Sequence, residues 1–232
     1  MSSVLFYQIV GRTVNSIEND AISAIKTEAF RDCRILTTVS FPNCTTIGSN
    51  AFSGCSALTT ASFQNCTTID YRAFEYCSAL TTVSFPNCIT IGSSAFFACQ
   101  ALTTASFPSC TTIGGSAFWG CNALTTAYFP NCTAIGIGAF IACLALTTAS
   151  FPNCTTISDY AFQFCSRLAS IYFLSQNIPL YGTNCFMGTA MTTSTVLGYF
   201  GSIYVLPSMV DAFKAADGWS SLADRIVAYG GE

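Results

Sequence analysis

The sequence predicts an elongated α/β solenoid built from 22-residue repeats, with a parallel β-sheet on one face and short helical turns or loops on the other. The first observation is the period: Leu36, Leu58, Leu80, Leu102, Leu124, Leu146 and Leu168 follow one another at intervals of 22 residues. The second is that one copy carries too few apolar residues to fold alone. Burying a large side chain contributes roughly 1.5–3 kcal/mol, whereas ordering a residue costs about 1.5 kcal/mol. Stacked copies share one continuous core, so we expect a single elongated domain.

The N-terminal part of the chain departs from the regular pattern. Residues 1–13 match no repeat, and we expect them to form an N-terminal cap. Residues 14–35 form a degenerate first repeat, because their apolar residues stand one period before those of the next copy. This repeat holds most of the charge of the N-terminal region, as is typical of a terminal repeat.

Each of the six regular repeats, which span residues 36–167, opens with a short strand. In L-T-T-[VA]-S-F the apolar residues alternate with hydroxyl residues, which is the period of two that indicates a β-strand. The proline that follows in most copies, such as Pro42, cannot donate to a sheet and ends the strand. Ile47-Gly48 marks a second bend, and Ser49–Cys55 is expected to form a single helical turn on the opposite side.

The C-terminal part begins with a seventh repeat at Leu168, whose register is broken by an insertion around residues 174–183. We expect the repeat array to cover residues 14–190, as about eight repeats of which the first and last are degenerate. Residues 191–232 are expected to form a C-terminal cap of one strand, at residues 203–205, and one helix. Pro207 opens this helix and Asp217-Gly218 ends it.

The repeat L-x-x-[VA]-x-F-P-x-C-x-x-I-G-x-x-A-F-x-x-C-x-x resembles the leucine-rich repeat of the BspA-like bacterial surface proteins. The segment IYVLPSMVDAFKAADGWSSLADRI is similar to the one that commonly closes such arrays. The first cysteine column departs from the family, which more often has an aliphatic residue there, and the period is one residue shorter than its commonest one. The resemblance implies a right-handed leucine-rich-repeat superhelix and a noncatalytic adhesive role at a bacterial surface. It does not identify a ligand.

The cysteines are predicted to be buried, reduced and structural. Thirteen of the fourteen, from Cys33 to Cys165, recur every eleven residues. Thiols of one column lie one repeat apart, at about 4.8 Å, whereas a disulfide needs Cβ atoms near 3.8 Å. Ile22 replaces a cysteine in the first repeat, which indicates an apolar column. We therefore expect no disulfide.

Two outward columns of the strand face are the candidate binding residues. One column consists of Thr38, Thr60, Thr82, Thr104, Thr126 and Thr148, and the next of Ser40, Ser62, Ser84, Ser106, Tyr128 and Ser150. The resemblance suggests that this open face binds a ligand. Two alternatives stay open: the hydroxyls simply suit a solvated sheet, or the regular array binds ice. Tyr128 and Tyr172 interrupt the column and are the first expected aromatic anchors.

The aromatic residues divide into two groups. The two recurrent phenylalanine columns, Phe41 to Phe173 and Phe30 to Phe162, occupy inward positions and are predicted to form the core. Exposed aromatics are expected at the variable positions around the helical turn: Tyr71, Tyr76, Phe97, Trp119 and Phe164. With little charge nearby, these side chains could form an apolar surface patch.

Composition excludes several functional classes. Charged residues make up 8% of the chain and the net charge is −3, so nucleic acid is not an expected partner. The chain has no histidine and no C-x-x-C motif, so we expect no metal site, and nothing in it predicts a cofactor. Isolated carboxylates such as Asp70, Glu75 and Asp159 do not form a catalytic pair. We expect no enzymatic activity.

Location is predicted by the resemblance alone. No run of 18 apolar residues predicts a transmembrane helix. The first residues lack a basic leader and a cleavage site, so either the chain is not secreted by the general route or a signal has been removed. The resemblance favours the cell surface or secretion, whereas many reduced thiols favour the cytosol.

Two functional hypotheses follow. The leading one is a noncatalytic binding module that recognises a protein or glycan through its strand face. The alternative is a structural, self-associating subunit of a filament or surface layer, since a low charge promotes association.

Overall fold

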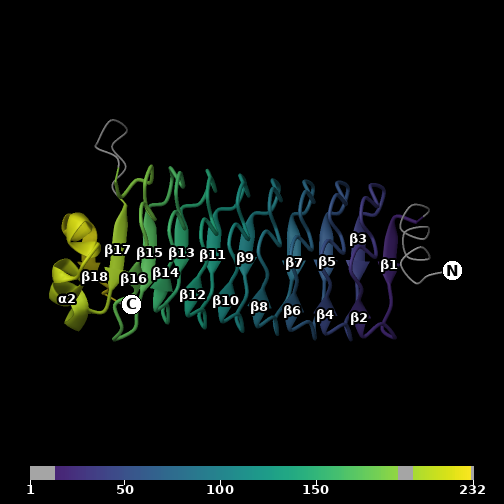
Figure 1. Cartoon of the computed structure of the whole chain (residues 1–232), viewed down its shortest axis with the longest axis horizontal. Helices are drawn as coiled ribbons and strands as arrows, with labels where there is room; N and C mark the ends of the chain where they lie inside the picture. Colours follow the sequence, from purple (N-terminus) through teal and green to yellow (C-terminus); the bar gives the residue numbers. More distant parts are fainter. Residues whose placement is uncertain (1–13, 193–200, 231–232) are drawn as a thin grey trace.

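The computed structural model describes residues 14–192 and 201–230. They form a rod of stacked coils, with the first repeat at one end and the helical C-terminal segment at the other (Figure 1). In the regular coils, paired strands are parallel and one 22-residue repeat apart, as in Thr38 with Thr60 and Val39 with Ala61. The predicted parallel solenoid with a 22-residue repeat is therefore confirmed.

One face of the rod, the strand face, carries the first strand of each coil. These strands are β1 (Ser16–Glu18), β3 (Thr38–Ser40), β5 (Thr60–Ser62), β7 (Thr82–Ser84), β9 (Thr104–Ser106), β11 (Thr126–Tyr128), β13 (Thr148–Ser150), β15 (Ser170–Phe173) and β17 (Ser202–Val205). β18 (Ile226–Ala228) pairs with β17 and ends the row. The alternation predicted from L-T-T-[VA]-S-F holds, because the central residues such as Val39 and Ala61 are fully buried.

A second row of short strands follows the proline bend. It consists of β2 (Ala24–Ile25), β4 (Thr46–Ile47), β6 (Thr68–Ile69), β8 (Thr90–Ile91), β10 (Thr112–Ile113), β12 (Ala134–Ile135), β14 (Thr156–Ile157) and β16 (Leu180–Tyr181). These eight strands form one continuous sheet. The isoleucine of each of the first seven strands points into the core.

The third side, which we call the turn face, consists of consecutive turns and not of the expected helical turn. In one coil, the amides of Asn50, Phe52 and Gly54 donate to carbonyls of the next coil at 2.9, 2.7 and 2.8 Å. Asn50 and Gly54 have φ angles of 55° and 75°. A left-handed residue at every fourth position excludes a helix. The segment thus gives up intrahelical hydrogen bonds for a third row of bonds between coils.

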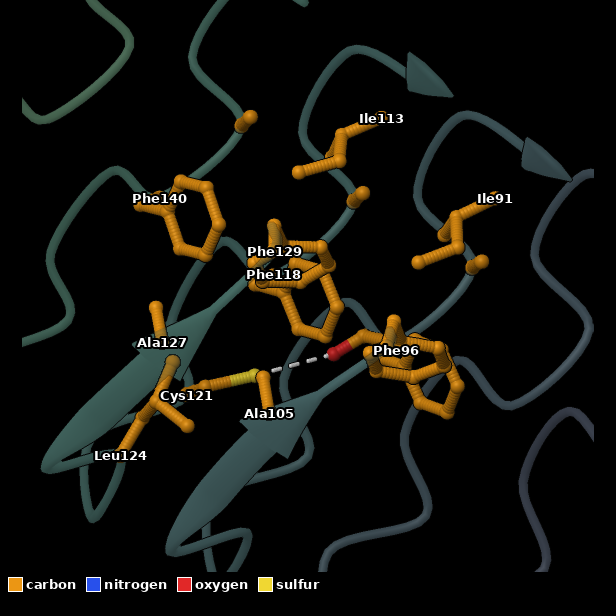
Figure 2. Packing of buried hydrophobic residues seen from close by; sticks show 14 of the residues in the cluster. Ile91, Phe96, Ala105, Ile113, Phe118, Cys121, Leu124, Ala127, Phe129 and Phe140 are labelled. Carbon is orange, nitrogen blue, oxygen red and sulfur yellow. Dashed lines mark hydrogen bonds between the residues drawn. The ribbon is translucent and has the colours of Figure 1, made fainter. Parts of the chain in front are cut away.

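The core is a set of parallel columns of identical side chains (Figure 2). Phe118 stacks on Phe96 and Phe140, both with centroids 5.2 Å apart, and meets Phe107 and Phe129 edge-on or nearly so. All fourteen cysteines lie within the described residues; they are buried and none forms a disulfide. The predicted burial of the phenylalanine and cysteine columns is confirmed.

The C-terminal segment closes its end of the core. After β17 come a 3₁₀ turn (η1, Pro207–Met209), a helix (α2, Val210–Ala215) and a longer 3₁₀ segment (η2, Trp219–Arg225). Trp219 is fully buried, and its Nε1 donates to the Pro179 carbonyl at 2.8 Å. The strand and helix expected here are present, whereas η2 and β18 were not predicted. The cap expected at residues 1–13 lies outside the described residues.

The strand face is divided between β7 and β9. The amide of Phe63 donates to the Ser84 carbonyl and that of Phe107 to the Tyr128 carbonyl. Within the described ranges the amide of Phe85, which stands between them, has no such bond, and β7 and β9 belong to separate sheets. Val83 is half-buried at this break. The second row and the turn face continue across it, so they hold the two halves of the rod together.

Candidate binding faces of the rod

Two columns of threonine hydroxyls are part of the scaffold. Thr59 Oγ1 donates to the Thr37 carbonyl of the preceding coil at 2.9 Å, and most equivalent threonines of this column repeat the bond. On the second row of strands, Thr67 Oγ1 donates to the Thr45 carbonyl at 3.2 Å. Each of these carbonyls also accepts a backbone amide, as that of Thr37 does from Thr59 at 2.8 Å, so the hydroxyl adds a further hydrogen bond that ties its side chain to the scaffold.

The predicted threonine column is the one with free hydroxyls. Within the part of the chain that the structure describes, no hydroxyl of this column has a hydrogen-bond partner, apart from Thr82, whose Oγ1 lies 3.5 Å from that of Thr81. Thr82 and Thr104 are exposed, and the other members, Thr38, Thr60, Thr126 and Thr148, are half-buried. Thr82 and Thr104 flank the break between β7 and β9, which divides the column into two runs of three.

The neighbouring serine column is more varied. Ser62 and Ser84 both accept hydrogen bonds from Gln64 Nε2, at 3.3 and 3.1 Å, so this amide bridges them. Ser106 is exposed, and Tyr128, which follows it in the column, is 46% exposed. On one side of the break, Ser62 and Ser84 are therefore bridged by Gln64, whereas Ser106 on the other side is exposed.

An aromatic cluster ends the strand face on the C-terminal side. The ring of Tyr172 stacks on Tyr204, with centroids 4.7 Å apart, and meets the edge of Tyr229 at 5.8 Å. Sequence reasoning found Tyr172 and missed the other two. A signal for Tyr204 exists, since Ser202–Val205 repeats the Ser-Ile-Tyr pattern of Ser170–Phe173 in the same column.

The chemistry of the strand face is neutral. No charged residue occurs from Tyr76 to Ser158. The described residues contain no group of three or more His, Cys, Asp or Glu side chains that could hold a metal ion. The thiols point into the core, and burial raises the pKa of Cys110 to about 11, so this thiol stays protonated near neutral pH. Over the described ranges, no helix has the length and apolar character needed to span a membrane.

The turn face carries the exposed aromatic residues that the sequence predicts. Tyr71, Tyr76, Trp119 and Phe164 are exposed, and Phe97 is half-buried. Phe97 connects two of them, with its ring 5.5 Å from Tyr76 and 5.6 Å from Trp119. This side of the rod is therefore a second candidate interaction surface.

A parallel solenoid with 22-residue coils, a buried leucine and phenylalanine core and an open strand face defines a leucine-rich-repeat protein. The model of the BspA-type leucine-rich repeat region, six copies long, matches residues 2–125 and 90–205. The chain belongs to this family. Its members are repeat proteins used for binding or surface roles, typically surface-associated and generally without enzymatic activity.

Solved structures of bacterial leucine-rich-repeat proteins share the fold. A leucine-rich-repeat protein of T. pallidum is similar over 75% of this chain and 80% of its own, with 24% identity and a TM-score of 0.58. One from Eubacterium ventriosum is similar over 85% of this chain and 89% of its own, with 15% identity and a TM-score of 0.53. None of the curated proteins matches the sequence. These similarities establish the architecture.

Proposed function

We propose that the protein is a noncatalytic adhesin-type module that binds a neutral glycan or protein surface at the bacterial cell surface through its strand face. The observation that carries the proposal is the contrast between neighbouring threonines. Thr59 and most of its equivalents donate their hydroxyls to backbone carbonyls, whereas among the described residues the hydroxyls of Thr60 and its equivalents, apart from Thr82, have no hydrogen-bond partner. The free column presents one hydroxyl per coil at intervals of about 4.8 Å.

The aromatic residues of the same face supply the anchors. Tyr128 is exposed beside the free hydroxyls of Thr104 and Thr126, and the stacked pair Tyr172–Tyr204 extends the surface. Tyrosine combines an apolar ring with a polar tip, which suits recognition of polar, uncharged partners. Because the central coils hold no charge, we expect binding to depend little on ionic strength. The location at the surface follows the family's typical association.

The test is a binding screen against neutral glycans and host surface proteins, followed by charge insertion on the strand face. Thr82→Lys, Thr104→Lys and Tyr128→Lys, combined in one variant, place three cations on that face without touching the core. We expect this variant to lose at least tenfold in affinity, since each neutral contact is replaced by a solvated charge.

A matched control places the same charges on the second row of strands. Thr46, Thr90 and Thr112 are exposed there, and their replacement by lysine should leave affinity unchanged. Equal binding by the strand-face variant and the wild-type protein would refute the proposed surface. Glycan binding without protein binding, or the reverse, would identify the ligand class.

A further inference from the structure

The turn face holds a row of large side chains that the strand face does not explain. We call Tyr76, Phe97, Trp119, Ile141 and Phe164 the turn-face patch; they stand in five successive coils. Tyr76 is 55%, Trp119 40% and Phe164 48% exposed, while Phe97 and Ile141 are half-buried. Over four coil intervals the patch is about 19 Å long.

Two members of the patch occupy backbone positions that favour glycine. Tyr76 and Phe164 both have a φ of 59°, and the equivalent positions in other coils include Gly54 and Gly120. A bulky residue in this conformation costs about 1–2 kcal/mol relative to the ordinary one. The same conformation recurs in other coils, as at Ala98 and Ala142, so it belongs to the coil. What distinguishes Tyr76 and Phe164 is that they place large, exposed side chains at this position, which points to a contact surface.

The residues of the patch are arranged symmetrically about Trp119 along the rod axis. One coil away stand Phe97 and Ile141, in the same position of the repeat; two coils away stand Tyr76 and Phe164, again in equivalent positions. The patch is apolar on both sides of its centre. A surface with this order is complementary to itself when a second copy lies against it with the rod axis reversed.

The two ends of the patch carry charged residues of opposite sign. Arg72 lies at the N-terminal end, with its guanidinium 4.7 Å from the Tyr71 ring and 3.4 Å from Glu75. Asp159 lies four coils further on, at the adjacent position of the repeat. In a reversed second copy, Arg72 therefore faces the partner's Asp159, and the contact is made twice. A parallel arrangement would leave these charges about 19 Å apart.

We propose that the turn-face patch binds a second copy of this chain as an antiparallel pair, with a two-fold axis through Trp119. Trp119 then meets its own counterpart, Phe97 meets Ile141, and Tyr76 meets Phe164. The arrangement is isologous and closed, so it produces a pair and not a filament. A standard interface buries about 800 Å² per partner; for a contact carried by five side chains we expect a weaker association, with a dissociation constant in the micromolar range.

This pairing is independent of the ligand-binding proposal. The turn face and the strand face are different sides of the coil, so the pair would present two open strand faces. A bivalent particle gains avidity on a surface that displays many ligands. Failure of ligand binding would therefore leave the pairing unaffected, and the two are measured separately.

The first test is site-directed cross-linking of the full chain. The protein is first reduced, and a short bismaleimide is then added as the cross-linker. The fourteen native thiols are buried, so introduced surface thiols react first. Trp119→Cys should give cross-linked dimers by itself, because position 119 faces itself. Tyr76→Cys and Phe164→Cys should each give none alone but a cross-linked dimer when the two variants are mixed.

The second test reverses the charges. Arg72→Asp and Asp159→Arg should each weaken the dimer in sedimentation velocity, by about 2- to 30-fold for two ion pairs. The double variant should restore it, and restoration excludes a folding defect because the two residues are too far apart to meet within one chain. Thermal unfolding of each variant provides the control for Arg72, which also pairs with Glu75. Asp159 is half-buried and its carboxylate accepts the Thr183 amide at 2.6 Å, so its variant needs the same folding control as that of Arg72.

Two results would overturn the proposal. One is a wild-type chain that remains monomeric at hundreds of micromolar. The other is cross-linking of Tyr76→Cys with itself as efficiently as Trp119→Cys, which would indicate a parallel or irregular contact. Self-cross-linking at position 119, mixed cross-linking at 76 and 164 and rescue by the double charge reversal would together establish the antiparallel pair.

Discussion

Raising the pH should unfold the rod at a lower pH than the ionisation of one buried thiol would require. The core contains many thiols, and their effects on stability add. Burial raises the pKa of twelve cysteines above the ordinary value of 9.0. The folded protein keeps these protons, whereas the unfolded chain releases them above its ordinary thiol pKa. The stabilisation is complete below this value and is lost as the pH rises toward the raised values of the folded state.

The magnitude follows from the number of thiols. A group that stays protonated in the folded state contributes about 1.4 kcal/mol of destabilisation per pH unit above the unfolded pKa. At pH 9.5 each thiol that stays protonated costs about 0.8 kcal/mol, so the eleven other than Cys44 cost about 9 kcal/mol; at pH 10 their sum is about 15 kcal/mol. Native domains have about 5–15 kcal/mol of stability. We therefore expect cooperative unfolding between pH 9 and 10.

The assay is a series of urea unfolding curves from pH 8 to pH 10 in the presence of reductant, with thiolate absorbance recorded in parallel. The thiolates of these twelve cysteines should appear only as circular dichroism is lost. Replacing Cys44, Cys66 and Cys88 by valine removes three of the twelve groups and should lower the slope of stability against pH by about a quarter. Ile22 shows that this column accepts a β-branched residue. A stability that does not change over this range, or thiolate that forms in the folded state, would refute the reasoning.

Three further predictions concern the scaffold. Thr59→Val should cost about 1 kcal/mol of unfolding free energy, because it removes a hydroxyl that caps a carbonyl, while Thr60→Val should be neutral; urea midpoints measure both. Ala98→Gly should stabilise the protein by about 0.5–1 kcal/mol, since its φ is 56°, and an unchanged or lower midpoint would contradict this. The amide of Phe85 at the break should exchange with solvent faster than that of Phe63, and equal rates in native-state hydrogen exchange would mean that β7 and β9 are paired.

The sequence was sufficient to predict the coil, because a period fixes which residues face inward. Leu58, Ala61 and Phe63 recur one repeat later as Leu80, Val83 and Phe85, and only stacking buries all such sets at once. The buried thiols followed from the same logic. What the pattern did not reveal is that they also donate: Cys121 Sγ lies 3.2 Å from the Phe96 carbonyl of the preceding coil (Figure 2). The Phe96 carbonyl also accepts the Cys99 amide at 3.2 Å, so the thiol column adds a second hydrogen bond that an aliphatic column would lack.

The turn face shows where sequence reasoning reaches its limit. Ser49–Cys55 has the length and composition of a helical turn, and nothing local excludes it. The competing structure is stabilised by bonds to the next coil, such as Phe52 to Ala73 at 2.7 Å, which exist only after stacking. The same holds for the threonines, because Thr59 and Thr60 are adjacent and identical. Only the geometry of the coil separates the one that caps a carbonyl from the one that is free.

The two faces of the rod therefore vary in different ways, and this difference supports separate roles. On the strand face, some coils have a tyrosine where others have a serine. The strands keep their parallel pairing at these tyrosines, so the surface can adapt to a ligand at little conformational cost. On the turn face, large residues at positions such as Tyr76 and Phe164 carry a backbone strain that glycine at those positions would avoid. Hydrogen bonds to the neighbouring coils hold that strained backbone in place, since the amide of Tyr76 donates to the Phe97 carbonyl at 2.9 Å. Exposed aromatics at these positions contribute little to the core, and in the proposed antiparallel pair a second copy of the chain would cover them.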